Sequence, residues 1–375
     1  MNRLRSFVLW NLMIALDIAS LASAQGREGV PTLSGYMEIH LNKTENLPSE
    51  ADLHRFVLMV GHSFSDRIKF WSEVEVEHAF VEGEEESGEV AIEQAYIDLA
   101  IHRRVNLRAG MVLTPIGIIN ERHEPPTFHG VERTFVDTVI IPTTWRDVGA
   151  GVFGDLGRGF SYKAYVMPGL DATGFSAEEG IAEGRQQGSH ADASDPAITG
   201  RLEYRTHGLT AGGSFWYGGA GFGLIRLDID TPTVGIASLD ARYRRGRHEL
   251  RGQWSMVSIE GAGDLNRAMQ SRSGIGPNIA SRLLGAYGEA ATRVSPDSWT
   301  HEVMAFGRYE VFDTQNKMPA GFLPLDRLRR SAFTTGLTYY PDPDVAFKMD
   351  VVKEHNRSAI VRASWRVNVG VGWWF

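Results

Sequence analysis

The sequence contains no cysteine, which excludes a disulfide-held scaffold, a thiol nucleophile and a cysteine metal site. Beyond residue 24, no apolar run reaches 18 residues. This excludes a transmembrane helix but leaves a closed β-barrel as a route across a membrane. The formal net charge is −8 at pH 7, and lysine is scarce, so no concentrated basic face indicates a nucleic-acid partner.

The first 24 residues have the pattern of a secretory signal peptide. Arg3 and Arg5 precede an apolar stretch that ends near Leu21, and the small residues Ala22-Ser23-Ala24 follow. An uncleaved anchor is the alternative, but the run is short for a spanning helix and contains Asp17. We therefore expect a signal peptide at 1–24 and one domain at 25–375, within which no linker or change of composition occurs.

The rest of the chain repeats the two-residue period of a β-strand. In "DRIKFWSEVEVEHAF", for example, Val74 and Val76 alternate with Glu73, Glu75 and Glu77. Many of these segments are longer than the five or six residues typical of strands in soluble proteins. Sixteen strands are expected, at 34–43, 54–63, 67–80, 90–102, 105–113, 147–155, 159–168, 197–206, 209–217, 234–244, 247–257, 281–291, 299–311, 330–340, 344–354 and 361–375.

The connections between these segments alternate in length. Tight turns such as "SFSD", "LGRG", "THG" and "PDPD" are rich in turn-forming residues, whereas the intervening links include 114–146, 169–196, 218–233, 258–280 and 312–329. Long unstructured loops at every second connection are unusual in a soluble fold. Short turns on one side, long loops on the other and an even strand number are typical of an outer-membrane barrel. The fold class predicted is all-β: a 16-stranded antiparallel transmembrane β-barrel.

The final stretch, "RVNVGVGWWF", fits the last strand of such a barrel. Alternation places Val367 and Val369 toward lipid, and Arg366 and Asn368 toward the lumen. The aromatic residues at 373–375 then lie at the membrane interface, where aromatic rings are enriched.

Three segments resemble the phosphate-selective porin O and P family: "AYIDLAIHRRVNLRAGMVLTPIG" (95–117), "VERTFVDTVIIPTTWRDVGAGVFGDL" (131–156) and "GLTYYPDPDVAFKMDVV" (336–352). The resemblance implies a homotrimer of 16-stranded barrels, each pore narrowed by an inward-folded loop. It also implies that Trp373 and Phe375 form an assembly signal for the barrel-assembly machinery. Phosphate-selective members would have pore-lining arginines and a lysine cluster, but the six lysines here are scattered singly.

The third long loop, 114–146, is the expected constriction. Its segments "TPIGII" and "FVDTVIIP" are too apolar for a free outer loop, although packing against a neighbour or capping the mouth are alternatives. Charges of both signs in a folded-in loop would create a field that sorts ions. The candidate pore residues are Arg122, His123, Glu124, His129, Glu132, Arg133, Asp137 and Arg146 on this segment, with Arg108 and Arg366 on the wall. If His123 and His129 titrate near 6.5, anion preference should rise as the pH falls.

A passive pore in the bacterial outer membrane is the function that these patterns favour. It would admit small hydrophilic solutes or ions, among them anions such as phosphate, and would contact outer-membrane lipid and lipopolysaccharide. A barrel lipid hydrolase, with His301 as its nearest candidate histidine, and a secreted β-rich adhesin are the alternatives. No catalytic residue, metal or cofactor is expected, since no serine lies in a G-x-S-x-G frame and His123 and His129 lack H-E-x-x-H spacing.

Overall fold

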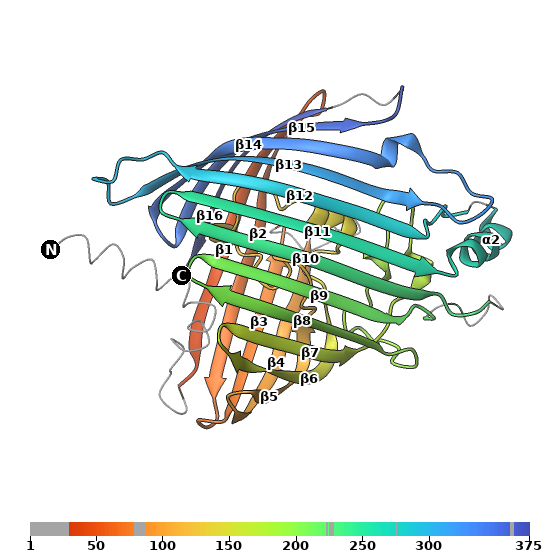
Figure 1. The fold of residues 1–375 in the computed structure, drawn as a ribbon, viewed down its shortest axis with the longest axis horizontal. Helices are drawn as coiled ribbons and strands as arrows, with labels where there is room; N and C mark the ends of the chain where they lie inside the picture. The colour runs from red at the N-terminus through yellow and green to blue at the C-terminus, as the bar shows by residue number, and fades with distance from the viewer. Residues whose placement is uncertain (1–29, 79–87, 223, 225–228, 275, 361–363) are drawn as a thin grey trace.

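A computed structural model describes residues 30–78, 88–222, 224, 229–274, 276–360 and 364–375. Within these residues, sixteen antiparallel strands form one closed barrel in which each strand pairs with its neighbours in sequence (Figure 1). The strands are β1 (Thr32–Thr44), β2 (Ser49–Ser63), β3 (Ile68–Glu77), β4 (Glu89–His102), β5 (Val105–Leu113), β6 (Arg146–Gly157), β7 (Phe160–Met167), β8 (Ala197–Thr206), β9 (Leu209–Gly219), β10 (Thr233–Arg245), β11 (His248–Glu260), β12 (Arg282–Arg293), β13 (Glu302–Lys317), β14 (Arg329–Asp342), β15 (Val345–Asn356) and β16 (Trp365–Trp374). The predicted signal peptide lies outside the described residues.

Pairing between β1 and β16 closes the barrel, with Tyr36 opposite Trp374. The backbones of Gly35 and Phe375 exchange two N–H···O bonds of 2.9 Å, and the Phe375 ring stacks on Phe56. A Cβ on Gly35 would lie 2.2 Å from the Val57 carbonyl oxygen, so only glycine fits at this closure. The final residue is thus part of the closing strand pair.

Every predicted strand overlaps an observed one, and the predicted fold class is confirmed. The segment 258–280 differs from its prediction as a loop, because it contains helix α2 (Ala262–Ser273). The Asn266 side chain bonds both the N–H and the carbonyl of Ile279, at 2.7 and 2.8 Å, which holds the returning chain against the helix. None of the helices in the described part of the chain is long and apolar enough to cross a membrane.

The outer face of the barrel follows the predicted alternation. On β16, Val367 and Val369 are each 43% exposed, whereas Asn368 between them is fully buried. Exposed apolar side chains continue around the wall, for example Leu239 on β10 and Met349 on β15. A belt of this kind suits contact with lipid.

The barrel interior holds an apolar core as well as polar groups. Inward-facing Val234 and Ile236 on β10 pack into one cluster with residues from the β5–β6 and β7–β8 connections, such as Ile140 and Phe175. Along the same face of β10, Ser238 and Asp240 are buried but polar. Along β10 the inner face therefore changes from apolar near the long loop to polar toward the short turn, and two-residue alternation alone does not predict this change.

Candidate functional site

The β5–β6 connection, residues 114–145, lies across the inside of the barrel. Its 3₁₀ turn η1 (Pro125–Thr127) contacts β1, β15 and β16, and its π-helical turn η2 (Val136–Ile140) contacts β11, β12 and β13. The connection also reaches β8, where Arg122 Nη2 bonds Glu203 Oε1 at 3.2 Å. Since these strands are distributed around a closed wall, the segment can contact all of them only from within.

A clasp at Asn120 fixes the base of this connection. The Asn120 amide donates to the carbonyl oxygens of Thr114 and Trp145 at 2.7 and 3.1 Å, and its oxygen accepts from the Trp145 N–H at 2.8 Å. Trp145 itself is buried against Trp216, with ring centroids 5.4 Å apart. Asn120 therefore joins the start and end of the segment where it enters the lumen.

Both predicted pore histidines are buried inside the barrel. His123 lies against β4, with Nε2 3.2 Å from Glu93 Oε2. His129 stacks on Phe306 and has Nε2 3.8 Å from Glu249 Oε1. Burial lowers the pKa of His129 to about 4. The expectation that His129 titrates near 6.5 is wrong, because the interior around it is packed with protein.

Other predicted residues form ion pairs or hydrogen bonds within the protein. Arg108 on β5 makes a bidentate contact with Asp98, at 2.7 and 2.8 Å, and its guanidinium lies over the Tyr96 ring. Asp137 accepts from Thr134 at 2.6 Å and from Gln253 at 2.7 Å. The carbonyl of Glu124 accepts from the hydroxyl and N–H of Thr127 and so organises η1. Of these contacts, the bond between Asp137 and Gln253 on β11 joins the connection to the wall.

A cavity of about 380 Å³ remains between the connection and the wall formed by β1–β4 and β13–β16. Its charged lining contains the predicted Glu132, Arg133, Arg146 and Arg366. The other charged or imidazole side chains that line it are Glu38, His40, His54, Arg55, Glu75, Glu77, Glu89, Arg185 and Arg308.

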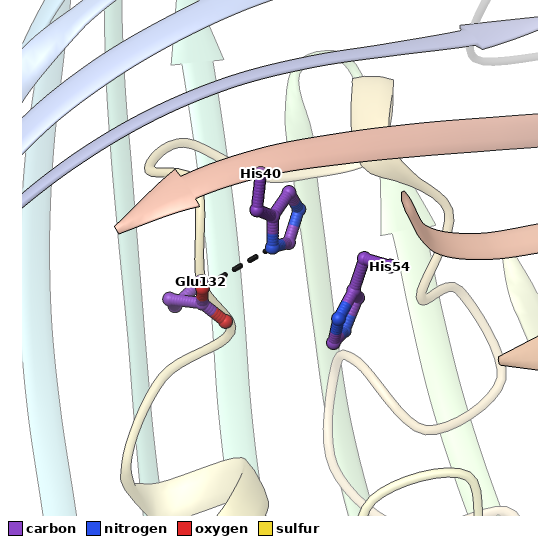
Figure 2. A group of neighbouring side chains, drawn as sticks. All are labelled: His40, His54 and Glu132. Atoms are coloured by element: carbon purple, nitrogen blue, oxygen red, sulfur yellow. Dashed lines mark ion pairs between the residues drawn. The ribbon is translucent and has the colours of Figure 1, made fainter. Parts of the chain in front are cut away.

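Figure 2 shows Glu132, from the connection, pointing at His40 on β1, with His54 of β2 beside it. Glu132 Oε1 is 3.2 Å from His40 Nδ1 and accepts from Asn42 at 2.8 Å. Although burial alone would raise it, these contacts lower the pKa of Glu132 to about 2. The carboxylate is therefore a fixed negative charge on the cavity wall.

Three arginines on the cavity are bonded mainly to uncharged groups. Arg133 donates to the hydroxyls of Thr143 and Thr144 at 2.5 and 2.8 Å. Arg185 donates to the backbone carbonyls of Ala182 and Thr143 at 2.7 and 2.6 Å. Arg146 also faces a carbonyl, that of Thr144, and lies 3.4 Å from Glu89.

Sequence reasoning missed Arg185 because it comes from the next long connection, 168–196. Burial and the positive charge of nearby Arg146 act together to lower the pKa of Arg185, although acidic neighbours oppose them. Only the packing of two loops inside the barrel brings Arg185 close to Arg146.

The depressed pKa of His129 predicts a specific acid sensitivity. An unfolded histidine has a pKa of about 6.5, so between pH 6.5 and 4 the unfolded chain binds a proton that the folded barrel excludes. The contribution of His129 to the free energy of unfolding is therefore complete above pH ~6.5 and is lost as the pH falls toward 4. His129→Gln should remove up to about 3 kcal/mol of this loss. The measurement is the difference between the urea midpoints at pH 7.5 and pH 4.5, in the parent, in His129→Gln and in a control variant of the exposed His207, His207→Gln. If His129→Gln changes this difference no more than His207→Gln does, the prediction is wrong.

Comparison with known proteins gives one sequence relative and several structural ones. No family model matches the chain. An uncharacterized protein of Aquifex aeolicus (strain VF5) is 36% identical over 342 residues, which are 88% of this chain and 77% of that protein. The chain belongs to the family of that protein.

Solved structures with the same fold are outer-membrane proteins. The outer membrane channel DcaP of Acinetobacter baumannii has a TM-score of 0.60 at 12% identity, over 92% of this chain and 97% of its own. An anion-selective porin from Comamonas acidovorans has a TM-score of 0.59 at 13% identity, over 92% and 99%. OmpT of Vibrio cholerae, in a trimer form, has a TM-score of 0.57 at 9% identity, over 93% and 100%. At these identities the likeness establishes the fold.

Proposed function

We propose that this chain is a porin of the bacterial outer membrane, through which small hydrophilic solutes and ions diffuse passively. One observation carries the proposal: a closed sixteen-stranded barrel with an apolar outer belt encloses a cavity lined by charged side chains of both signs. Barrels of this size can hold an aqueous channel. Residues 114–145 lie across the interior and would form the constriction.

The charges on the cavity favour small anions, with modest selectivity. Arg133 and Arg185 bond neutral oxygens, so their positive charges are not cancelled by those contacts. The carboxylates on the opposite wall are more closely paired: Glu38 lies 2.5 Å from Arg55 Nε, and Glu75 lies 3.3 Å from Arg55 Nη1. Phosphate is one anion of suitable size. We also propose that the chain is a member of the phosphate-selective porin O and P family.

Neutralising these arginines tests the preference for anions. Arg133→Gln and Arg185→Gln should each move the reversal potential in a KCl gradient toward that of a nonselective pore, and the double variant further. Planar-bilayer recording of the refolded proteins measures this shift. Arg122→Gln is the matched control, since Arg122 is on the same connection but bonds Glu203 outside the cavity. If Arg122→Gln shifts the reversal potential as much as Arg133→Gln and Arg185→Gln do, the cavity arginines are not the cause of the anion preference.

We propose no catalytic activity for the barrel. His301 lies at the start of β13 between Trp299 and Tyr339, with ring centroids 5.0 and 5.6 Å away. The nearby Ser295 hydroxyl bonds the backbone carbonyl of His301. This arrangement resembles an interfacial aromatic cluster, and a lipase assay on the folded protein tests the alternative.

We also propose how the chain is exported and assembled. The chain would lose residues 1–24 on export, use Trp373 and Phe375 as a signal to the barrel-assembly machinery, and form a homotrimer. Crosslinking in outer-membrane vesicles tests the trimer, and N-terminal sequencing of the assembled protein tests the cleavage.

A further inference from the structure

We propose that Glu73, Glu93 and His123 form a binding site for one divalent transition-metal ion, with Zn²⁺ as the probe. Glu73 comes from β3, Glu93 from β4 and His123 from the connection that crosses the lumen. All three side chains are buried, at 0%, 0% and 1% exposure. A bound ion would fasten the connection to the barrel wall.

The distances suit a tetrahedral ion. His123 Nε2 lies 3.2 Å from Glu93 Oε2 and 3.8 Å from Glu73 Oε1. Zinc binds histidine nitrogen and carboxylate oxygen at about 2.0–2.2 Å, so neighbouring ligand atoms in a tetrahedral site lie about 3.4 Å apart. The two measured distances lie within 0.4 Å of that spacing, and all three ligand atoms lie within 4.8 Å of one another.

Hydrogen bonds outside the triad orient two of the ligands. His123 Nδ1 is 3.1 Å from the Asn120 carbonyl oxygen, an acceptor, which places the proton on Nδ1 and leaves Nε2 toward the carboxylates. Gln94 Nε2 donates to Glu73 Oε2 at 2.6 Å and leaves Oε1 toward the histidine. Outer contacts of this kind are the usual support of metal-binding histidines and carboxylates.

Several buried polar atoms around the triad lack partners. Glu73 Oε1, Glu93 Oε1 and the Tyr36 hydroxyl have no hydrogen-bond partner among the described residues. The Tyr36 ring also packs edge-on against His123, with centroids 6.1 Å apart. Buried carboxylate oxygens without partners are costly, and a divalent cation would neutralise both carboxylates at once.

The nearby group of His40, His54 and Glu132 fits a metal less well. Its side chains converge in Figure 2, and their ligand atoms also lie within 4.8 Å of one another. However, Arg55 Nη2 lies 3.2 Å from His54 Nε2 and would place a positive charge beside the ion. Glu132 already accepts from Asn42. The buried triad is therefore the stronger candidate.

Metal titration of the refolded barrel tests the site. The protein is stripped with EDTA and titrated with ZnCl₂, and bound zinc is measured by elemental analysis after desalting. We expect one equivalent and a rise in the temperature at which the heat-resistant folded band disappears. Gln94→Ala should weaken binding by about 10–100-fold. Glu93→Gln and His123→Gln should weaken it more, and His129→Gln, which changes the other buried histidine of the connection, should not.

Two results would overturn the proposal. If the folded parent retains no zinc at saturation, the triad shares protons rather than a metal. If zinc binds equally to the parent, Glu93→Gln and Glu73→Gln, the ion lies elsewhere. If a triad variant fails to fold, zinc binding to the parent and to the milder Gln94→Ala variant still tests the proposal. The measurement needs no channel activity, so it stands or falls independently of the proposed porin function.

Discussion

Replacing Val369 with arginine is expected to destabilise the folded barrel by about 2–4 kcal/mol, the range for a cation near the bilayer midplane on the lipid-facing surface of a barrel. Val369 is exposed in the middle of β16, where it pairs with Leu41 and Met349, two other exposed apolar residues. The measurement is the urea midpoint of reversible folding into lipid vesicles.

The chain supplies a control on the neighbouring strand. Lys353 lies on β15, on the outer face that also carries Met349, and it pairs with Trp365 at the start of β16. Its ammonium is 5.0 Å from the centre of the Trp365 ring. Lys353→Arg keeps the positive charge that this face already carries near the interface, so it should leave the midpoint unchanged. A Val369→Arg barrel as stable as Lys353→Arg would mean that Val369 does not face hydrocarbon. Asn368 is not a suitable control, because it is fully buried and donates to Asp350 at 2.7 Å.

Replacing residues 120–140 with a short Gly-Ser linker is expected to raise single-channel conductance several-fold. This segment contains η1 and η2 and contacts strands around the inner wall, so its removal would leave a wide lumen. The wall carboxylates that it contacts, such as Glu203 and Asp350, would keep their wall partners Arg201 and Asn368 and would become hydrated. Single-channel recording of the refolded variant measures the change.

A second loop replacement controls for general disturbance of the barrel. Helix α2 lies at the end opposite the C-terminus in Figure 1, where many of its side chains are exposed. Replacing 262–273 with a linker should change conductance far less than replacing 120–140. Unchanged conductance without 120–140, in a barrel shown to be folded, would exclude this connection as the constriction.

The sequence by itself determined the barrel and its two faces. Strand pairing and lipid contact impose a two-residue period that each segment carries locally, as in the alternation around Val367 and Val369. Alternating short and long connections then determined the number of strands and their order, and all sixteen were predicted in place. The helix at 262–273 was missed because its few apolar positions lie within one long loop.

Only the tertiary structure decided which charges face the cavity. Sequence patterns alone predict a water-filled lumen, so His123, His129 and Asn368 are expected to be solvated. In the structure, the folded connection buries them inside the protein. Arg133 and Arg185 come from different loops, and Glu73, Glu93 and His123 from three separate segments, so no local spacing relates them. Their proximity results from closing the barrel around its own loops, which is a long-range packing event that a strand's local period does not encode.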